Sequence, residues 1–146
     1  MKISARTRYG LRILLDVAMH AQDEAPRTIN AIAQSQSISP AFISRLAVPL
    51  KRAGLIHSQR GVSGGLRLAK SPDNITLLAI TEALDGPVSI LTCLSKPKTC
   101  KRHSSCPART MWGDLNLTIR GALSNITLSS VLKRLGLRHD DVDYCI

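Results

Sequence analysis

The sequence predicts a mainly α-helical fold with one small β-hairpin. Along most of the 146 residues, apolar side chains recur at the three- and four-residue spacing of amphipathic helices. Only one Phe, one Trp and two Tyr residues are present, so Leu, Ile, Val and Ala must build the core. Two short strand-like segments flank one glycine-rich turn. A chain of this length, 44% hydrophobic, is expected to form one domain with or without an extension.

The first expected helix covers residues 7–21. Its apolar residues recur at helical spacing from Leu11 to Ala18. Two cations, Arg6 and Arg8, lie at its start, where the positive end of the helix dipole disfavours them. We therefore expect a group outside this helix to compensate their charge.

The next two expected helices are short and are joined by a tight turn. Thr28 is placed to cap the first of them, and residues 35–38 form the turn. Ser39 is placed to cap the second, Pro40 favours its first position, and Gly54 ends it. Two short helices joined in this way form a helix-turn-helix, whose second helix enters the major groove of DNA.

A basic β-hairpin is expected directly after these helices. Residues 56–59 and 66–69 read as two short strands, and the segment RGVSGG between them supplies the turn. Its glycines permit positive φ angles and a close approach of the backbone to another surface. Arg60, Arg67 and Lys70 make this hairpin basic. A helix-turn-helix followed by such a hairpin predicts a winged helix-turn-helix.

A long amphipathic helix at residues 108–124 is an addition that a winged helix does not need. We expect it to be a dimerisation element, and the alternative is that it packs back on its own domain. Trp112 lies beside its apolar stripe. The stripe consists of Met111, Leu115, Thr118, Ile119 and Ala122.

These elements divide the chain into four parts. The winged helix-turn-helix domain covers residues 1–86, and a cysteine-bearing loop, too poor in apolar residues to order itself, covers residues 87–106. The dimerisation helix and a last helix ending at Gly136 occupy residues 107–136. Residues 137–146 are expected to form an acidic, flexible tail.

The net charge of +10 is concentrated in the first half of the chain. Residues 1–70 contain eleven Lys and Arg against three Asp and Glu, whereas the remainder contains nine against seven. This excess favours a polyanionic partner, with nucleic acid ahead of an anionic membrane surface. The sequence has no signal peptide, no long apolar run and no catalytic motif, which favours a cytoplasmic protein that is not an enzyme.

Three of the four cysteines lie close together, at Cys93, Cys100 and Cys106. Four cations and His103 lie among them, with no carboxylate, and nearby cations favour the thiolate form. In the reducing cytosol, clustered thiols bind metal or sense redox state more often than they form structural disulfides. The residues alone leave open an iron–sulfur cluster, either [2Fe–2S] or [4Fe–4S], a zinc site or a thiol switch.

Four segments together resemble the Rrf-two family of bacterial winged-helix regulators: MKISARTRYGLRILLDVA, ISPAFISRLAVPLKRAGLI, RGVSGGLRLAKSP and ITEALDGPVSI. The resemblance extends from Met1 to about residue 130, and the cysteine loop resembles that of the cluster-binding branch. It implies a homodimer with crossed long helices that binds palindromic double-stranded DNA. The DNA-binding residues expected on this basis are Arg6, Arg8, Thr28, Ser39, Ala41, Ser44, Arg45, Arg60 and Ser63.

The resemblance leaves the fourth cluster ligand open. In one group of cluster-binding members, a histidine three residues after the last cysteine completes the site, and this chain has Arg109 there. In another group, an aspartate of the partner's first helix serves, and this chain has Arg8 at that position. The spacing C-x6-C-x5-C also has a first gap one residue longer than usual. His103 is the candidate fourth ligand within the loop.

We therefore expect a cytoplasmic homodimeric transcription regulator, a repressor, whose loop senses iron–sulfur status, redox state or nitric oxide. Loss of the cluster would move the loop and the adjoining dimer helix, and with them the two recognition helices. A zinc or thiol-switch regulator of the same fold is the nearest alternative. A module that uses the helix-turn-helix for protein contact is the other.

Overall fold

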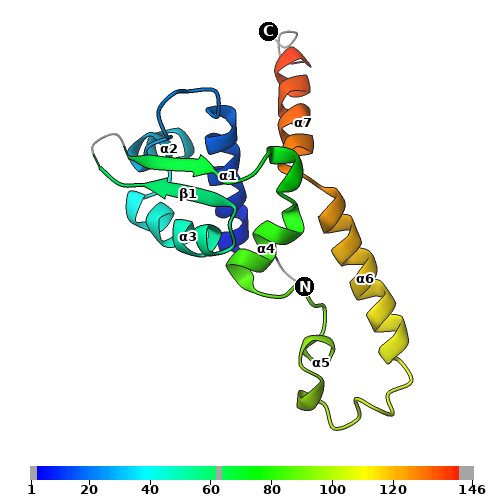
Figure 1. Ribbon diagram of the computed structural model, residues 1–146. Coiled ribbons are helices and arrows are strands. Elements are labelled where there is room, and N and C mark those ends of the chain that lie inside the picture. Colours follow the sequence, from blue (N-terminus) through cyan, green and yellow to red (C-terminus); the bar gives the residue numbers. More distant parts are fainter. Residues whose placement is uncertain (1–2, 62–63, 142–146) are drawn as a thin grey trace.

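The computed structural model describes residues 3–61 and 64–141 and has the mainly helical fold that the sequence predicts (Figure 1). Two antiparallel strands form the hairpin, and two short 3₁₀ turns interrupt the connections. The α-helices are α1 (Ala5–Met19), α2 (Ile29–Gln36), α3 (Pro40–Arg52), α4 (Leu77–Asp85), α5 (Thr92–Ser95), α6 (Arg109–Asn125) and α7 (Leu128–Asp141). The strands are β1 (Ile56–Gln59) and β2 (Gly65–Leu68), and the 3₁₀ turns are η1 (Pro72–Asn74) and η2 (Pro97–Thr99).

Side-chain caps fix where the helices of the DNA-binding domain begin. Ser4, Thr28 and Thr76 each accept a hydrogen bond of 3.1 Å from the backbone N–H three residues later. Ser39 does the same at 3.3 Å, and Pro40 occupies the first position of α3. Each cap satisfies an N–H that has no partner inside its helix. The predicted starts of α2 and α3 are therefore confirmed.

The turn between α2 and α3 depends on one residue with a left-handed backbone. Ser37 has φ 53° and ends α2, and its N–H bonds to Ala33. The next residue, Ile38, is buried and leads directly into the cap of α3. This left-handed residue reverses the chain within a few positions and sets α3 against α2 as a helix-turn-helix.

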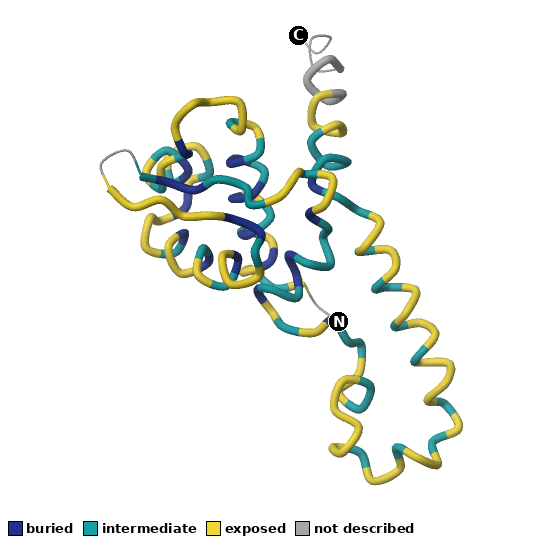
Figure 2. The backbone as a smooth tube through the Cα atoms, viewed as in Figure 1, coloured by how far each residue is buried: buried dark blue, intermediate teal, exposed yellow. Residues whose placement is uncertain are grey.

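One aliphatic core holds the winged helix-turn-helix together (Figure 2). Helix α1 lies at its centre and packs against α2, α3, α4 and β2. The contact with α4 is close at Gly10, where an added Cβ would lie 2.2 Å from the Leu84 side chain, so only glycine fits without a shift. The fully buried members are Ile13, Leu14, Ile32, Ile43, Leu46, Leu50, Leu55, Ile56, Leu66, Ile75, Ile80 and Leu128.

The hairpin is attached to the helices at both of its strands. Strand β1 pairs antiparallel with β2, with Ile56 opposite Leu68. On the other edge of β2, Leu66 exchanges two backbone hydrogen bonds with Arg27, of 3.1 and 2.8 Å. The Lys51 ammonium also donates to the Ser58 hydroxyl at 3.0 Å, which ties α3 to β1. The wing is therefore held at a fixed angle to the recognition helix.

Helix α6 extends away from the DNA-binding domain and contacts it through α4 (Figure 1). No residue of α6 is fully buried. The side towards α4 carries half-buried residues, among them Leu123 and one member of the predicted stripe, Ile119. The other stripe members are exposed: Met111, Leu115, Thr118 and Ala122. Met111 is 58% exposed and Leu115 is 44% exposed. The helix thus packs on its own domain at Ile119, and the exposed part of the stripe remains available for the predicted dimer contact.

Two expectations for the C-terminal half need correction. The segment 87–106 contains α5 and η2, so it does have local structure of its own, supported by the Thr99 hydroxyl bonding to the Lys96 carbonyl at 2.7 Å. Helix α7 continues through Gly136 to Asp141, because Gly136 does not adopt the left-handed backbone that would end it. The expected flexible tail is thus helical over 137–141, and residues 142–146 lie outside the described part.

Candidate DNA-binding surface and cysteine loop

The outward face of α3 carries the residues predicted to read DNA. Ala41, Ser44 and Arg45 are exposed, whereas Ile43 and Leu46 on the opposite face are buried. The apolar face fixes the rotation of the helix, and it therefore fixes which side chains point outward. The structure thus brings the three predicted readers together on one accessible helix face.

Aromatic side chains connect α1 to this recognition helix. The Arg45 guanidinium lies 5.6 Å from the centre of the Phe42 ring, and Phe42 meets Tyr9 edge to face at 5.6 Å and 89°. On the other side, the Arg12 guanidinium lies 5.4 Å from the Tyr9 ring. Such contacts between cations and rings contribute about 0.5–1 kcal/mol at exposed sites. These ring contacts orient Arg45. The spacing of residues along the sequence did not predict them.

The wing residue Arg60 and the start of α2 share one groove. This groove has a volume of about 470 Å³, and Thr28, Asn30 and Gln59 line it together with Arg60. All four residues are exposed. Predicted contacts from the wing and from the helix-turn-helix therefore lie on one continuous surface. Ser63, the other residue predicted on the wing, lies outside the described residues.

Two residues predicted from the first helix, Arg6 and Arg8, are exposed near its start. The group expected to compensate the charge of these two arginines is Asp85, at the end of α4. Its two carboxylate oxygens accept hydrogen bonds from the hydroxyls of Ser4 and Thr7, each at 2.7 Å. A carboxylate at a helix N-terminus is favourable, which offsets the two cations there. The guanidinium groups thereby stay available for an external anion.

A buried carboxylate, Asp16, anchors the helix-turn-helix to α1. Its side chain is 1% exposed and accepts hydrogen bonds from Ser35, from Gln36 at 3.0 Å and from Arg27 at 2.7 Å. Burial acts to raise the pKa of Asp16, but the hydrogen bonds from these three residues and the Arg27 charge outweigh it and hold the pKa below its usual value. Asp16 is therefore a fixed anion that ties α2 and the segment leading to it onto α1.

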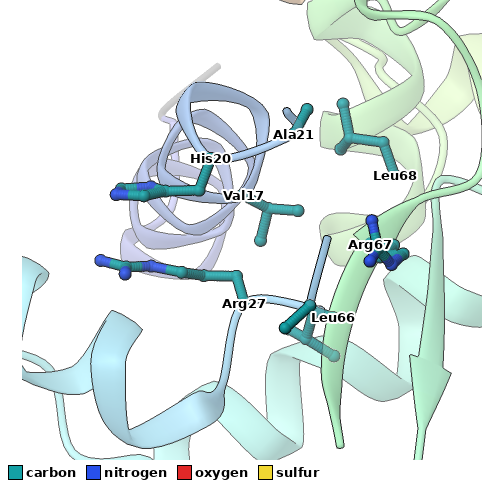
Figure 3. Close-up of a pocket in the computed structure, with 8 residues that line it drawn as sticks. Val17, His20, Ala21, Arg27, Leu66, Arg67 and Leu68 are labelled. Atoms are coloured by element: carbon teal, nitrogen blue, oxygen red, sulfur yellow. The ribbon is translucent and has the colours of Figure 1, made fainter. Parts of the chain in front are cut away.

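Beside this anchor lies a small cavity of about 100 Å³ (Figure 3). Figure 3 shows His20 and Arg27 lying side by side, and both contact Asp16: His20 Nδ1 lies 2.8 Å from its carbonyl oxygen. Val17, Leu66 and Leu68 supply apolar walls. Ala21 and Ala25, which also line it, are exposed, so the pocket is partly open to solvent, and its volume suits a few water molecules.

The structure places the predicted metal ligands in one loop but does not gather them. Cys93, Cys100 and Cys106 are free thiols, each half-buried. Within residues 3–61 and 64–141, no three His, Cys, Asp or Glu side chains are close enough together to hold a metal ion. The cations of the loop, Lys96, Lys98, Lys101 and Arg102, are all exposed.

His103 differs from the exposed residues around it. Its Nε2 atom is buried and has no hydrogen-bond partner among the described residues. A buried polar atom without a partner costs free energy, about 1–3 kcal/mol, so such atoms are rare in folded proteins. A neutral imidazole nitrogen can donate its lone pair to a metal ion. A bound metal would therefore give His103 Nε2 the partner that it lacks. By donor chemistry, three free thiols and this nitrogen fit an iron–sulfur cluster or zinc.

Hydrogen bonds to α6 hold the segment that enters the cysteine loop. The Asn116 side chain accepts from the Ile90 N–H at 3.0 Å, and Arg120 donates to the Val88 carbonyl at 3.3 Å. Arg120 also pairs with Glu82 of α4, which itself accepts from the Val88 N–H at 3.3 Å. The loop leaves α4 through this cluster and returns directly into α6. Its position is therefore linked to both helices.

Comparison with known proteins identifies the family. A family model described as "Rrf2: Iron-dependent Transcriptional regulator" matches residues 3–134. The chain belongs to the Rrf2 family. The HTH-type transcriptional regulator IscR of Aliivibrio salmonicida is 36% identical to it over 132 residues, which cover 90% of this chain and 77% of that protein. The protein rrf2 of Nitratidesulfovibrio vulgaris is 34% identical over 137 residues, covering 94% and 91%.

A solved structure of another regulator has the same fold. The global cysteine regulator CymR of B. subtilis aligns with a TM-score of 0.73 at 31% identity, over 92% of this chain and 98% of that chain. The relatives are transcription regulators and not enzymes, and this Rrf2-family chain is a DNA-binding winged-helix regulator. Among the described helices, none combines the length and the apolar character needed to cross a bilayer.

Proposed function

We propose that this Rrf2-family regulator acts as a cytoplasmic homodimeric repressor. Its affinity for a palindromic operator depends on a cofactor bound by the cysteine loop. One observation carries the DNA-binding part of this proposal. The exposed readers of α3 and the wing residue Arg60 lie on one surface, and Ser44 and Arg60 line the same groove of about 400 Å³. A duplex lying along this surface would be contacted by both elements at once.

Each predicted contact has a distinct role in this arrangement. Ala41, Ser44 and Arg45 face the edges of base pairs in the major groove, where bidentate arginine contacts give the strongest discrimination. Arg60 extends from the wing, and narrow minor grooves attract such a cation. The remaining predicted residues contact the phosphate backbone: Arg6, Arg8, Thr28, Ser39 and Ser63.

The homodimer rests on the outward stripe of α6. Apolar side chains that are about half exposed along one helix face are costly unless another surface covers them. The stripe is continuous at helical spacing, so a second copy of the same helix is the occupant that fits it most simply. Two winged helices joined in this way would contact two half-sites related by a twofold axis, which matches a palindrome.

The cofactor proposal rests on the donor set of the loop. Cys93, Cys100 and Cys106 would supply three thiolates, and His103 is our candidate for the fourth ligand because its Nε2 lacks any other partner among the described residues. When bound, an iron–sulfur cluster supplies a centre that responds to oxidants, nitric oxide and iron supply. Zinc is the alternative occupant, since three thiols and one imidazole also form a structural zinc site.

Switching follows from the way the loop is attached. To gather the three thiols, the loop must close, and its entry at Ile90 is hydrogen-bonded to Asn116 of α6. Closure would therefore pull on α6, which carries the proposed dimer stripe. A small change in the crossing of two such helices alters the spacing of two recognition helices. The wild-type protein should thus bind its operator differently with and without the cofactor.

Salt dependence of operator affinity tests the DNA-binding part of this proposal. Because the surface carries several cations, the affinity should fall steeply as salt rises, with a slope set by the number of phosphate contacts. Replacing Arg60 with Ala should weaken binding by about 1–3 kcal/mol if the arginine reads a groove, and less if it only contacts phosphate. Fluorescence anisotropy with a duplex selected from random sequences measures both. An R60A variant with unchanged affinity and salt slope would contradict the role given to the wing.

A further inference from the structure

One exposed apolar side chain interrupts the otherwise polar face of the recognition helix. Val48 is 50% exposed, although it lies within α3 and not at a chain end or in a loop. Along α3 it follows Ala41 by seven residues and Ser44 by four, so all three share one face of the helix. Val48 therefore extends the face formed by Ala41 and Ser44 towards the C-terminal half of α3.

The surroundings of Val48 exclude the two ordinary roles of a valine. It is not part of the core, which contains Ile43, Leu46 and Leu50 on the opposite side of α3. The groove that it lines also contains Ile29, Ala47 and Leu66, but these three are half-buried or buried. The exposed side chains of the groove other than Val48 are all polar or cationic: Ser44, Lys51, Arg52, Ser58 and Arg60. One exposed methyl-bearing side chain among exposed cations suits a partner that combines anionic phosphates with a small apolar group.

Double-stranded DNA provides such a group in one place only. In the major groove, the C5-methyl of thymine is the single apolar feature at a base-pair edge, and apolar side chains contact it. We propose that Val48 is a specificity-determining residue that contacts a thymine methyl group in each operator half-site. This inference rests on the proposed operator binding through α3 and adds the base that this position selects. Ala41, Ser44 and Arg45 would read the neighbouring pairs.

Exchange of thymine for uracil tests this contact, because uracil lacks only the methyl group. A duplex selected from random sequences is synthesised with each thymine of the half-site replaced in turn by deoxyuridine. The wild-type protein should bind one such duplex about four-fold more weakly per half-site, the value expected when one methyl group is no longer buried. Val48→Ser should bind the thymine duplex at that weaker level and should not distinguish thymine from uracil. Val48→Ile should retain the distinction.

Met19→Ser is the matched control, since Met19 is similarly exposed, at 54%, but is the last residue of α1 and not part of the recognition helix. It should show the wild-type preference for thymine. A wild-type protein that binds every uracil duplex as well as the thymine duplex would overturn the inference while leaving operator binding intact. Equal discrimination by wild type and Val48→Ser would overturn it as well. Failure to select any duplex would instead contradict the proposed function itself.

Discussion

At the scale of single residues, Asp16 shows how a buried charge is made compatible with an aliphatic core. Its carboxylate is almost fully buried, but three hydrogen-bond donors from the helix-turn-helix segment satisfy it. A buried anion without these donors would be costly. The sequence showed Asp16 only as a polar interruption of an apolar helix, because its donors, Arg27, Ser35 and Gln36, come from segments 11 to 20 residues away.

Asp16→Asn should destabilise the domain by about 2 kcal/mol at neutral pH, because the amide loses the charge that Arg27 and the hydroxyl donor favour. The pKa of Asp16 is lowered in the folded state, so its ionised form contributes stability above the ordinary carboxyl pKa. That contribution is lost as the pH falls through the lowered folded-state pKa. Urea unfolding should therefore show that the difference in free energy of unfolding between wild type and variant becomes smaller as the pH is lowered.

The control for this prediction is Asp23→Asn, which changes an exposed carboxylate in the loop after α1. It should leave the free energy of unfolding within about 0.5 kcal/mol of wild type. An Asp16→Asn protein as stable as wild type at every pH would show that the carboxylate does not anchor the helix-turn-helix.

The cysteines allow a second test at this scale. Cys93→Ala, Cys100→Ala and Cys106→Ala should each lose the cofactor, because a three-thiolate site cannot hold it with two. Cys145→Ala should retain it, since Cys145 is outside the loop. Iron, sulfide and zinc analysis of anaerobically purified protein, together with its absorption spectrum, measures this. Colourless protein with one zinc per chain would show that the site holds zinc and not an iron–sulfur cluster. Equal retention of the cofactor in all four variants would refute the proposed set of ligands.

At the scale of elements, helices with clear caps were predictable and the ends without them were not. Ser39 followed by Pro40 marks the start of α3 in the sequence, and the structure begins the helix there. The last helix was expected to end at Gly136, but a glycine ends a helix only when its backbone turns left-handed, and that choice is not encoded in the residue type alone. The turns inside the cysteine loop were missed because Ser and Thr side chains bond to the nearby backbone and Pro fixes its own φ, and neither effect leaves an apolar period in the sequence.

The outward stripe of α6 predicts dimerisation by this element. Leu115→Asp should place a charge in the proposed interface and weaken the dimer by about 3 kcal/mol, roughly 100-fold. Ser124→Asp adds the same charge to the same helix at an exposed position off the stripe, and it should leave the dimer intact. Sedimentation equilibrium would measure both. A Leu115→Asp protein that stays dimeric would exclude this face as the interface.

At the scale of the whole molecule, packed contacts run from the cysteine loop to the DNA-binding surface. The loop entry bonds to α6, and Arg120 of α6 pairs with Glu82 of α4. Helix α4 packs closely on α1 at Gly10, and α1 reaches α3 through the Tyr9–Phe42 ring contact. The core makes α1, α3 and α4 a rigid unit, so a shift of α6 that is transmitted to α4 through the Arg120–Glu82 pair would move the recognition helix with its domain.

The overall arrangement of the elements was largely predictable from the sequence. The contacts that couple the cysteine loop to the DNA-binding domain were not. Order and spacing of the helix-turn-helix, wing and long helix were enough to predict the architecture. The hydrogen bonds that link the loop to α6 depend on Asn116 and Arg120, which the sequence presents as ordinary polar positions of an amphipathic helix. Only the folded chain brings them to Val88 and Ile90.

The most direct test of the account compares operator affinity in one anaerobic preparation before and after the cofactor is removed. Fluorescence anisotropy with the selected duplex should give dissociation constants that differ by at least about five-fold, the lower end of ordinary coupling between two sites. Cys106→Ala, which lacks the cofactor from the start, should match the stripped wild-type protein. Identical dissociation constants for the loaded and stripped forms would contradict the claim that the cysteine loop controls binding to DNA.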